Sequence, residues 1–342
     1  MSSAKLTVGA VVPVRDGGED LRRCLVALAR ATSPPDDVVV VIDGRPGPSA
    51  DADGDCARRL GARVVVVGSN GGPARARNLG ATNTHADVLF FVDADVAVRP
   101  DAVARVREAF VDPAIAAVFG SYDDTPAAPN FISQYKNLFH HYVHQIARED
   151  ATTFWAGCGA VRADVFRAVG GFDETYREPC IEDIELGHRL TARGHRVRVV
   201  KRLQATHLKW WTARSLLVAD VYRRAVPWTE LILRDRRMAN DLNVRVAERV
   251  SAALAWLLLI SLTLALVWPR SLLAAAGAAA MLLVLNAHLY RFFLRKRGAV
   301  FLLGAIAWHW FYYLYGTVGF GLGALRHFRS VRRPYRLAEH TP

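Results

Sequence analysis

Cysteine is scarce in this sequence, and the motifs that depend on it are missing. Four cysteines occur in 342 residues, and no two of them are separated by only two residues. This usage excludes a disulfide framework and gives no support to a zinc ribbon or a redox-active dithiol. Four free thiols are compatible with a reducing compartment.

Other signals are absent as well. No phosphate-binding loop ending in Gly-Lys-Ser or Gly-Lys-Thr is present, so the sequence does not indicate ATP hydrolysis. Hydrophobic residues make up 52% of the chain, which excludes an intrinsically disordered protein. Met1 to Lys5 leads directly into an apolar run without the pattern of a secretory signal. We therefore expect the N-terminal domain to stay in the cytoplasm.

Acidic residues nearly disappear toward the C-terminus. Residues 1–186 hold 19 basic and 26 acidic residues, residues 187–249 hold 15 and 5, and residues 250–342 hold 10 and 1. The basic part should face an anionic partner. Nucleic acid is one candidate, but an anionic lipid leaflet fits better because the basic residues flank long apolar runs. We therefore expect membrane lipids, and no nucleic acid, as partners.

Charge is also missing from two long apolar runs. Val250 to Trp268 and Leu272 to Tyr290 each contain 19 residues without Asp, Glu, Lys or Arg. Each run would extend about 28 Å as a helix, close to a bilayer core of about 30 Å. We expect two spans at about 250–268 and 272–290, and a third apolar segment, 299–325, that spans or re-enters the membrane. Basic flanks place the loops in the cytoplasm.

The segment from Thr212 to Arg237 mixes apolar residues with several arginines. This composition favours a helix on the bilayer surface. The expected organisation is therefore a catalytic domain over 1–211, an interfacial segment over 212–249, a membrane domain over 250–325 and a basic cytoplasmic tail over 326–342. Buried core helices of a soluble protein are the less favoured interpretation of the apolar runs.

The N-terminal part alternates between two periodicities. Short β-branched runs are separated by stretches of about ten residues with helical spacing, which predicts a mostly parallel sheet flanked by helices. The expected strands are Leu6–Val14, Val38–Ile42, Arg63–Val67 and Val88–Val92, and the expected helices are Asp20–Ala31, Asp51–Leu60 and Pro73–Ala81. Ligands of such sheets bind beyond the carboxyl ends of the strands.

Polar residues follow these strands. Asp93 and Asp95 come directly after Val88–Val92, and paired carboxylates at a strand exit can hold a divalent cation. Arg75 lies on a Gly-rich loop that leads into a helix, an arrangement that suits phosphate. Each pattern alone is weak, since Asp-x-Asp is more often a capped turn and an exposed helix often carries arginine.

Two later segments add further candidates. Glu182, Asp183 and Glu185 open an expected helix, where acidic residues either complement the helix dipole or include a general base. His207 lies in "QATHLKWW", as a strand-end residue or as a metal ligand.

Taken together and in order, these pieces resemble the inverting glycosyltransferases of family 2, which have the nucleotide-sugar-binding GT-A fold. The matching segments are "AVVPVRD", "VVVVIDG", "NGGPARARNLGA", "FVDAD", "GGFDE", "IEDIELGHRL" and "THLKWW", from about Leu6 to about Trp228. The resemblance implies an α/β GT-A fold with a Rossmann-like mixed sheet, here followed by C-terminal transmembrane helices.

The resemblance also implies roles for individual residues. It implies nucleotide-sugar contacts for Pro13, Val14, Asp43, Arg75 and Asp93, a divalent cation (Mg²⁺ or Mn²⁺) on Asp95, Asp93 and His207, and Asp183 as the catalytic base. We place Gly157, Glu182 and Trp210 on the acceptor side.

Two departures from the family pattern matter. Ile42 stands where the family often has a second Asp before Asp43, and the Gln-x-x-Arg-Trp motif of processive synthases is absent near Trp210. The transfer of one or a few sugars is therefore favoured over polymer synthesis.

We expect a metal-dependent, membrane-bound hexosyltransferase of the cell envelope that moves a sugar from a nucleotide-diphosphate donor to a lipid-linked or other membrane-associated acceptor. It would be a multi-pass protein of the cell membrane with its catalytic domain on the cytoplasmic face. Three alternatives stay open: a soluble acceptor with the membrane part as an anchor, a non-catalytic membrane scaffold, and a nucleotidyltransferase.

Overall fold

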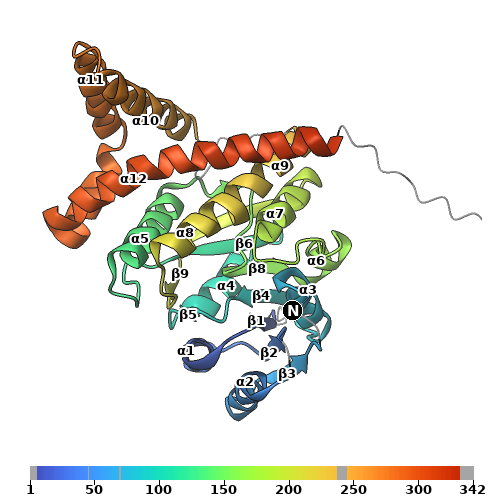
Figure 1. The fold of residues 1–342 in the computed structure, drawn as a ribbon. Coiled ribbons are helices and arrows are strands. Elements are labelled where there is room, and N and C mark those ends of the chain that lie inside the picture. Colours follow the sequence, from blue (N-terminus) through green and yellow to red (C-terminus); the bar gives the residue numbers. More distant parts are fainter. Residues whose placement is uncertain (1–5, 45, 69–70, 237–244, 332–342) are drawn as a thin grey trace, which may run out of the picture.

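The structure is a computed structural model that describes residues 6–44, 46–68, 71–236 and 245–331. An α/β body carries the N-terminal two-thirds of the chain, and a group of helices follows it (Figure 1). Three predicted features fall partly outside the described residues: positions 69–70 of the Gly-rich loop, Arg237 at the end of the amphipathic segment, and most of the basic tail.

A single mixed sheet forms the centre of the body. Its described strands are β1 (Val8–Val14), β2 (Asp37–Ile42), β3 (Arg63–Val66), β4 (Val88–Val92), β5 (Val96–Val98), β6 (Ile115–Tyr122), β7 (Asp150–Ala151), β8 (Cys158–Arg162) and β9 (Arg196–His207). Their order is β3-β2-β1-β4-β8-β6-β9-β5, and β7 pairs with β9 at the side.

Most of the strands run in one direction. The pairs β1–β2, β2–β3, β1–β4 and β6–β9 are parallel. Strand β8 lies antiparallel between β4 and β6, so β4 and β6 share a direction. The carboxyl ends of β1, β2, β4, β6 and β9 consequently meet at one edge, and the predicted mixed, mostly parallel sheet is confirmed.

Helices cover both faces of this sheet. They are α1 (Gly18–Ala29), α2 (Pro48–Arg59), α3 (Pro73–Thr82), α4 (Ala102–Ala109), α5 (Phe131–Ile146), α6 (Ala163–Ala168) and α7 (Glu182–Ala192). Helices α2 and α3 begin with proline, whose missing N–H and fixed φ suit the first helical position. Two apolar clusters fill the faces of the sheet, one including Val12 and Phe90, the other Phe91 and Phe119.

The amphipathic segment is helical throughout its described part. It forms α8 (Ala213–Asp220), a π-helical turn η1 (Val221–Ala225) and α9 (Val226–Asp235). The π turn directly precedes Pro227, which has no N–H for the regular helical hydrogen bond. The Thr229 hydroxyl donates to the Ala225 carbonyl (2.7 Å), which satisfies one acceptor at this irregularity.

The C-terminal apolar runs fold as α10 (Val246–Leu264), α11 (Ser271–Leu285) and α12 (Ala287–Val331). Helices α10 and α11 form a hairpin that projects away from the α/β body, whereas α12 runs along the body over α8 and α9 (Figure 1). Helix α12 bends at Gly298, where φ is 80°.

The predicted membrane spans are therefore only partly supported. Among the described residues, Val246–Leu264 alone is long and apolar enough to cross a bilayer by itself. Helix α11 has 15 residues and qualifies only together with α12, across a bend of 68°. A second span over 272–290 is not confirmed. Residues 299–325 form continuous helix after the bend at Gly298, and whether this segment spans or re-enters a membrane stays a prediction.

Candidate active site

A cleft of about 230 Å³ opens at the shared carboxyl edge of the strands. Asp93 and Asp95 enter it from the end of β4, His207 from the end of β9, and Asp183 from the first turn of α7. These residues are as many as 114 positions apart in the sequence, from 93 to 207. The topology thus places the predicted metal ligands and the predicted base around one cavity.

Arg77 connects the carboxylate of Asp93, after β4, with that of Glu182, at the start of α7. Its Nη2 donates to Asp93 Oδ1 (2.7 Å) and its Nη1 to Glu182 Oε1 (2.8 Å), while the guanidinium lies over the Phe172 ring. The side chains of Arg77 and Glu182 are 6% and 5% exposed. Because a buried charge requires a partner, Arg77 fixes the N-terminus of α7 against the end of β4.

Asp183 has the environment of a general base. Its Oδ2 accepts from the Ala156 N–H (3.1 Å) and its Oδ1 from the Ile184 N–H (2.8 Å). Burial, with the negative charge of Glu182, raises its pKa to about 7, although Arg77 acts in the opposite direction. A carboxylate with a pKa near the working pH can take a proton and release it again.

Asp95 and His207 form the site that best fits a divalent cation. His207 Nδ1 lies 2.6 Å from Asn137 Oδ1, so that nitrogen carries the proton, while Nε2 faces Asp95 Oδ2 at 3.6 Å. Burial would raise the pKa of Asp95, but hydrogen bonding to His207 and the charges of His207 and Lys209 hold it at about 2. An imidazole oriented by an amide and facing a carboxylate is a common metal-ligand arrangement.

Asp93 is committed elsewhere, since one of its oxygens is bound by Arg77. Within the described ranges, no three His, Cys, Asp or Glu side chains converge in a way that could hold a metal ion. The protein ligands therefore reduce to the Asp95–His207 pair, and the remaining ligands would come from substrate oxygens or water.

The predicted nucleotide-side residues lie at the ends of β1 and β2. Asp43 is 4% exposed, and its two oxygens accept from the N–H groups of Gly71 and Gly72 (2.8 and 2.7 Å). Gly72 has φ of 88°, and a Cβ there would lie 2.2 Å from the Arg177 carbonyl oxygen, so only glycine fits. Asp43 thus shapes the Gly-rich loop.

The other three nucleotide-side residues contribute no side chain to the cleft as described. Pro13 and Val14 end β1 and pair with β2, and Arg75 is exposed on the first turn of α3. Their nucleotide contacts stay predictions.

The acceptor-side residues are placed differently from one another. Glu182 lines the cleft but is held by Arg77 and by the Cys180 N–H (2.8 Å), so it positions other groups. Gly157 accepts from the Asp93 N–H, and a side chain there would meet the Trp155 ring. Trp210 is 59% exposed, and its neighbour Trp211, 8% exposed, lines the cleft in its place.

Helix α5 supplies a wall that sequence reasoning only touched on. The rings of His140 and His144 lie 3.9 Å apart between centroids and are tilted by 35°, and Trp155 and Tyr122 contact His140. Burial lowers the pKa of His140, and its Nδ1 has no hydrogen-bond partner within the part of the chain that the structure describes. These histidines are therefore neutral and form an aromatic wall of the cleft.

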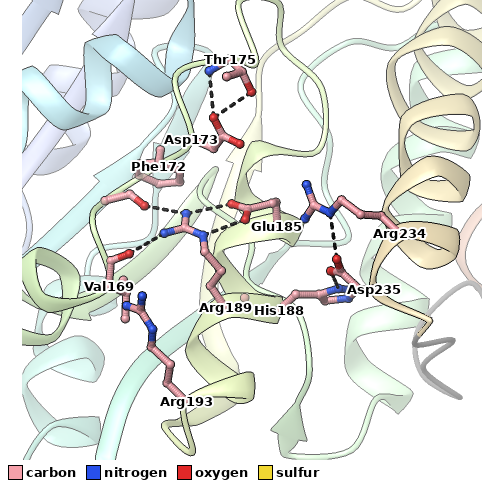
Figure 2. A network of polar contacts seen from close by, with 12 residues as sticks. Val169, Phe172, Asp173, Thr175, Glu185, His188, Arg189, Arg193, Arg234 and Asp235 are labelled. Carbon is pink, nitrogen blue, oxygen red and sulfur yellow. Dashed lines mark hydrogen bonds and ion pairs between the residues drawn. The ribbon is translucent and has the colours of Figure 1, made fainter. Parts of the chain in front are cut away.

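Figure 2 shows how α7 is held in place. Arg189 donates to both oxygens of Glu185 (2.7 and 2.8 Å) and to the carbonyls of Val169 and Gly171 (2.7 and 2.6 Å). On the other side of the helix, His188 Nδ1 lies 3.7 Å from Asp235 Oδ2 on α9. Helix α7, which carries Asp183, is thereby tied both to the α6 turn and to the C-terminal helices.

Comparison with known proteins agrees with this geometry. Residues 10–170 match the model of the family described as Glycosyl transferase family 2. The "Pre-mycofactocin glycosyltransferase" of Mycobacterium tuberculosis is 30% identical over 221 residues, which cover 61% of this chain and 45% of that protein. The "Validoxylamine A glucosyltransferase" of Streptomyces hygroscopicus is 30% identical over 227 residues, covering 55% and 48%. The chain spans about half the length of these curated relatives.

The architecture extends to a solved structure. A mannosyltransferase from Pyrobaculum calidifontis, solved in complex with GDP-Man and Mn²⁺, aligns with a TM-score of 0.56 at 16% identity, covering 96% of this chain and 88% of that chain. This likeness concerns the fold. Residues 10–170 are thus similar to glycosyltransferase family 2, and the chain shares the overall fold of that mannosyltransferase structure.

Proposed function

We propose that this protein is a membrane-bound, inverting glycosyltransferase that moves one sugar from a nucleoside-diphosphate donor to a membrane-associated acceptor. The observation that carries the proposal is the convergence of Asp183 with Asp93, Asp95 and His207 on one cleft. The family 2 match and the glycosyltransferase names of the relatives support the reaction class. The names of those two relatives mention different molecules, pre-mycofactocin and validoxylamine A, so they do not indicate one acceptor for this chain.

The chemistry follows from the position of Asp183. Asp183 takes the proton of the acceptor hydroxyl as the acceptor oxygen forms its bond to the anomeric carbon. The bond between that carbon and the diphosphate oxygen breaks at the same time, and its electron pair leaves with the nucleoside diphosphate. A single displacement inverts the anomeric centre. The pKa of Asp183 is raised to about 7, which supports this role. Near neutral pH its carboxylate can accept the proton of the acceptor hydroxyl and release it afterwards.

Asp95 and His207 would hold the divalent cation, and Asp93 would face the donor through its free oxygen. A bound Mg²⁺ or Mn²⁺ would supply positive charge against the developing charge of the leaving diphosphate. The imidazole of His207 favours Mn²⁺, since nitrogen ligands suit it better than Mg²⁺. Arg77 maintains the carboxylates in their places.

Membrane attachment is supported by the C-terminal hairpin. Leu266, Val267 and Leu273 are 85%, 90% and 79% exposed at and beside its turn. Contiguous exposed apolar surface of this kind marks contact with lipid or with another protein. The basic segments beside the hairpin favour a cytoplasmic position for the catalytic domain in the cell membrane.

A donor screen tests the proposal. The purified full-length protein in lipid nanodiscs is incubated with Mn²⁺, a total lipid extract and a panel of nucleotide sugars, and released nucleoside diphosphate is measured. One donor should give release that depends on lipid extract and is abolished by chelation. Release that is equal with a water-soluble sugar acceptor and no lipid would favour the anchored enzyme with a soluble acceptor. An absence of release with every donor would favour the scaffold.

A further inference from the structure

A second cavity lies beside the catalytic cleft, between the amphipathic helices and the C-terminal helices. Its volume is about 420 Å³, within the range of about 300–1,000 Å³ of small-molecule sites. Its walls come from η1, α9, α10 and α12, and α5 and α8 contribute one side chain each. Helix α12 contacts η1, α9 and α10, so these elements come together around the cavity.

The wall of this cavity is mostly apolar. Trp228 and Ile232 come from α9, Trp256 from α10, and Phe320 from α12. Trp256 Nε1 donates to the Thr317 hydroxyl (2.6 Å), so the indole is satisfied while its ring faces the cavity. An apolar wall with internally satisfied polar groups favours a hydrocarbon ligand.

One end of the cavity is charged. Lys136 Nζ donates to Asp220 Oδ1 (2.7 Å), and the Tyr315 hydroxyl donates to Asp220 Oδ2 (2.9 Å). These two charges neutralise each other. Arg224 lies beside them, half-buried, and no hydrogen bond or ion pair reaches its guanidinium from any residue that the structure describes. Glu248 and Arg249 also line the cavity, and Glu248 accepts hydrogen bonds from Arg245 (2.9 Å) and from the Tyr313 hydroxyl (2.8 Å). The Arg224 guanidinium is therefore a positive charge in the lining that is available to an anion.

The charged end is also the junction with the catalytic cleft. Lys136, Arg224 and Trp228 line both cavities. A molecule with its apolar part in the larger cavity would therefore place its polar end in the cleft that contains Asp183. The two cavities together have the shape and polarity of an amphiphile site.

We propose that the larger cavity binds the hydrocarbon chain of an anionic amphiphile, with its phosphate on Arg224 and its head in the catalytic cleft. This inference rests on the proposed glycosyl transfer and narrows its acceptor to a phosphate-bearing lipid. A guanidinium recognises phosphate through paired, charge-assisted hydrogen bonds.

Two glycines on α12 provide a matched pair of variants. Gly316 lines the cavity, and a Cβ added there meets open space. Gly321, five residues later on the same helix, also meets open space but is exposed and lies outside the cavity lining. Gly316→Leu fills the cavity, whereas Gly321→Leu adds the same side chain elsewhere. Both replacements favour helix, since glycine is the weaker helix former by about 1 kcal/mol.

The probes are bromododecyl phosphate and its neutral counterpart, bromododecanol. Quenching of tryptophan fluorescence is followed in full-length protein held in phosphatidylcholine nanodiscs, because Trp228 and Trp256 line the cavity. Wild type and Gly321→Leu should show the same saturable quenching by the phosphate. Gly316→Leu should bind at least about tenfold more weakly, since each displaced methylene changes affinity about fourfold.

Arg224→Gln tests the head group. It should weaken binding of the phosphate about 10- to 100-fold and leave the neutral alcohol unchanged, because a hydrogen bond to a charged group is lost. Equal quenching in Gly316→Leu and wild type would mean that the probe partitions onto exposed helices, and it would overturn the inference. Equal loss for phosphate and alcohol in Arg224→Gln would overturn the phosphate assignment.

Donor binding separates this inference from the function on which it rests. Binding of the active nucleotide sugar with Mn²⁺ is titrated on wild type, Gly316→Leu and Gly321→Leu. If Gly316→Leu keeps full donor binding and transfer and also binds the amphiphile as wild type does, only the cavity assignment is contradicted. If the protein binds the amphiphile saturably but binds no nucleotide sugar, the proposed transferase function is contradicted and the amphiphile site is not.

Discussion

Asp183 is the residue on which the proposed chemistry depends most directly. In the proposed mechanism its carboxylate is the base, and burial together with the negative charge of Glu182 raises its pKa to about 7. The active form is deprotonated, so turnover should be full above pH 7 and should fall as pH drops below it. Asp183→Asn should lower turnover about 10²- to 10⁴-fold and remove this dependence, with donor affinity unchanged. Released diphosphate measured from pH 5 to pH 9 checks both points. A variant that keeps the wild-type pH profile would contradict the assignment.

Arg77 and Arg75 lie two positions apart on α3 and should respond differently to the same change. Arg77→Met leaves Asp93 and Glu182 without their shared partner, so it should destabilise the protein by about 3–5 kcal/mol. Arg75→Met removes an exposed side chain and should change stability by less than about 0.5 kcal/mol.

Chemical denaturation of the two variants measures this difference. If Arg75 contacts the nucleotide, its variant also weakens donor binding at unchanged stability. Equal stability of the two variants would show that Arg77 does not hold the site together.

The identity of the key carboxylates could be predicted from the sequence, but their partners could not. Asp93, Asp95, Asp183 and His207 stand in short motifs, and all four line the cleft. Arg77 and Arg224 carry no such signal, since arginine on a helix is usually solvated. Trp210 and Trp211 are adjacent, and only the path of the chain after β9 decides that Trp211 turns inward.

At the scale of elements, α7 is held by contacts that its sequence does not display. Arg189 lies on this helix and Arg193 directly follows it, and both donate to carbonyls at the end of α6 (Figure 2). Glu185, the partner of Arg189, is 4% exposed, whereas the Arg193 contact lies at the surface. Arg189→Met should therefore destabilise the protein by about 2–3 kcal/mol, and Arg193→Met by less than about 0.5 kcal/mol.

Arg189→Met should also lower turnover while donor affinity stays the same, because the first turn of α7 presents Asp183. Rescue of turnover by Arg189→Lys, which keeps the ion pair, would distinguish positioning from a general loss of stability. Parallel losses of turnover in Arg189→Met and Arg193→Met would contradict this account.

The strands and helices up to Val92 could be predicted closely, because buried β-branched runs and proline-started helices are local signals. Strand β4 is confirmed at Val88–Val92, and α3 begins at Pro73 as expected. The apolar C-terminal runs were harder. Composition alone does not predict which helices pack against one another, and the contacts of α12 with α9 and α5 join residues far apart in the sequence.

For the whole molecule, the test is association with lipid. Ile260 on α10 is 51% exposed and Val66 on β3 is 54% exposed. Ile260→Arg should reduce partition into phosphatidylcholine vesicles about 100-fold, since an arginine within a bilayer is unfavourable by about 2.5–3.5 kcal/mol. Val66→Arg should float with vesicles as wild type does, at low and at high salt. Equal flotation of the two variants would contradict insertion of the hairpin.

The course of α12 also decides how the polypeptide can be shortened. Tyr315 reaches back from α12 to Asp220, and Lys296 and Arg297 bind the segment after β6, at Asp124. A fragment trimmed before α10 to avoid detergent would keep the sheet and its loops but would lose one side of the substrate entrance. The missing wall would explain a loss of activity in such a fragment. That loss would therefore give no information on the proposed roles of the remaining carboxylates.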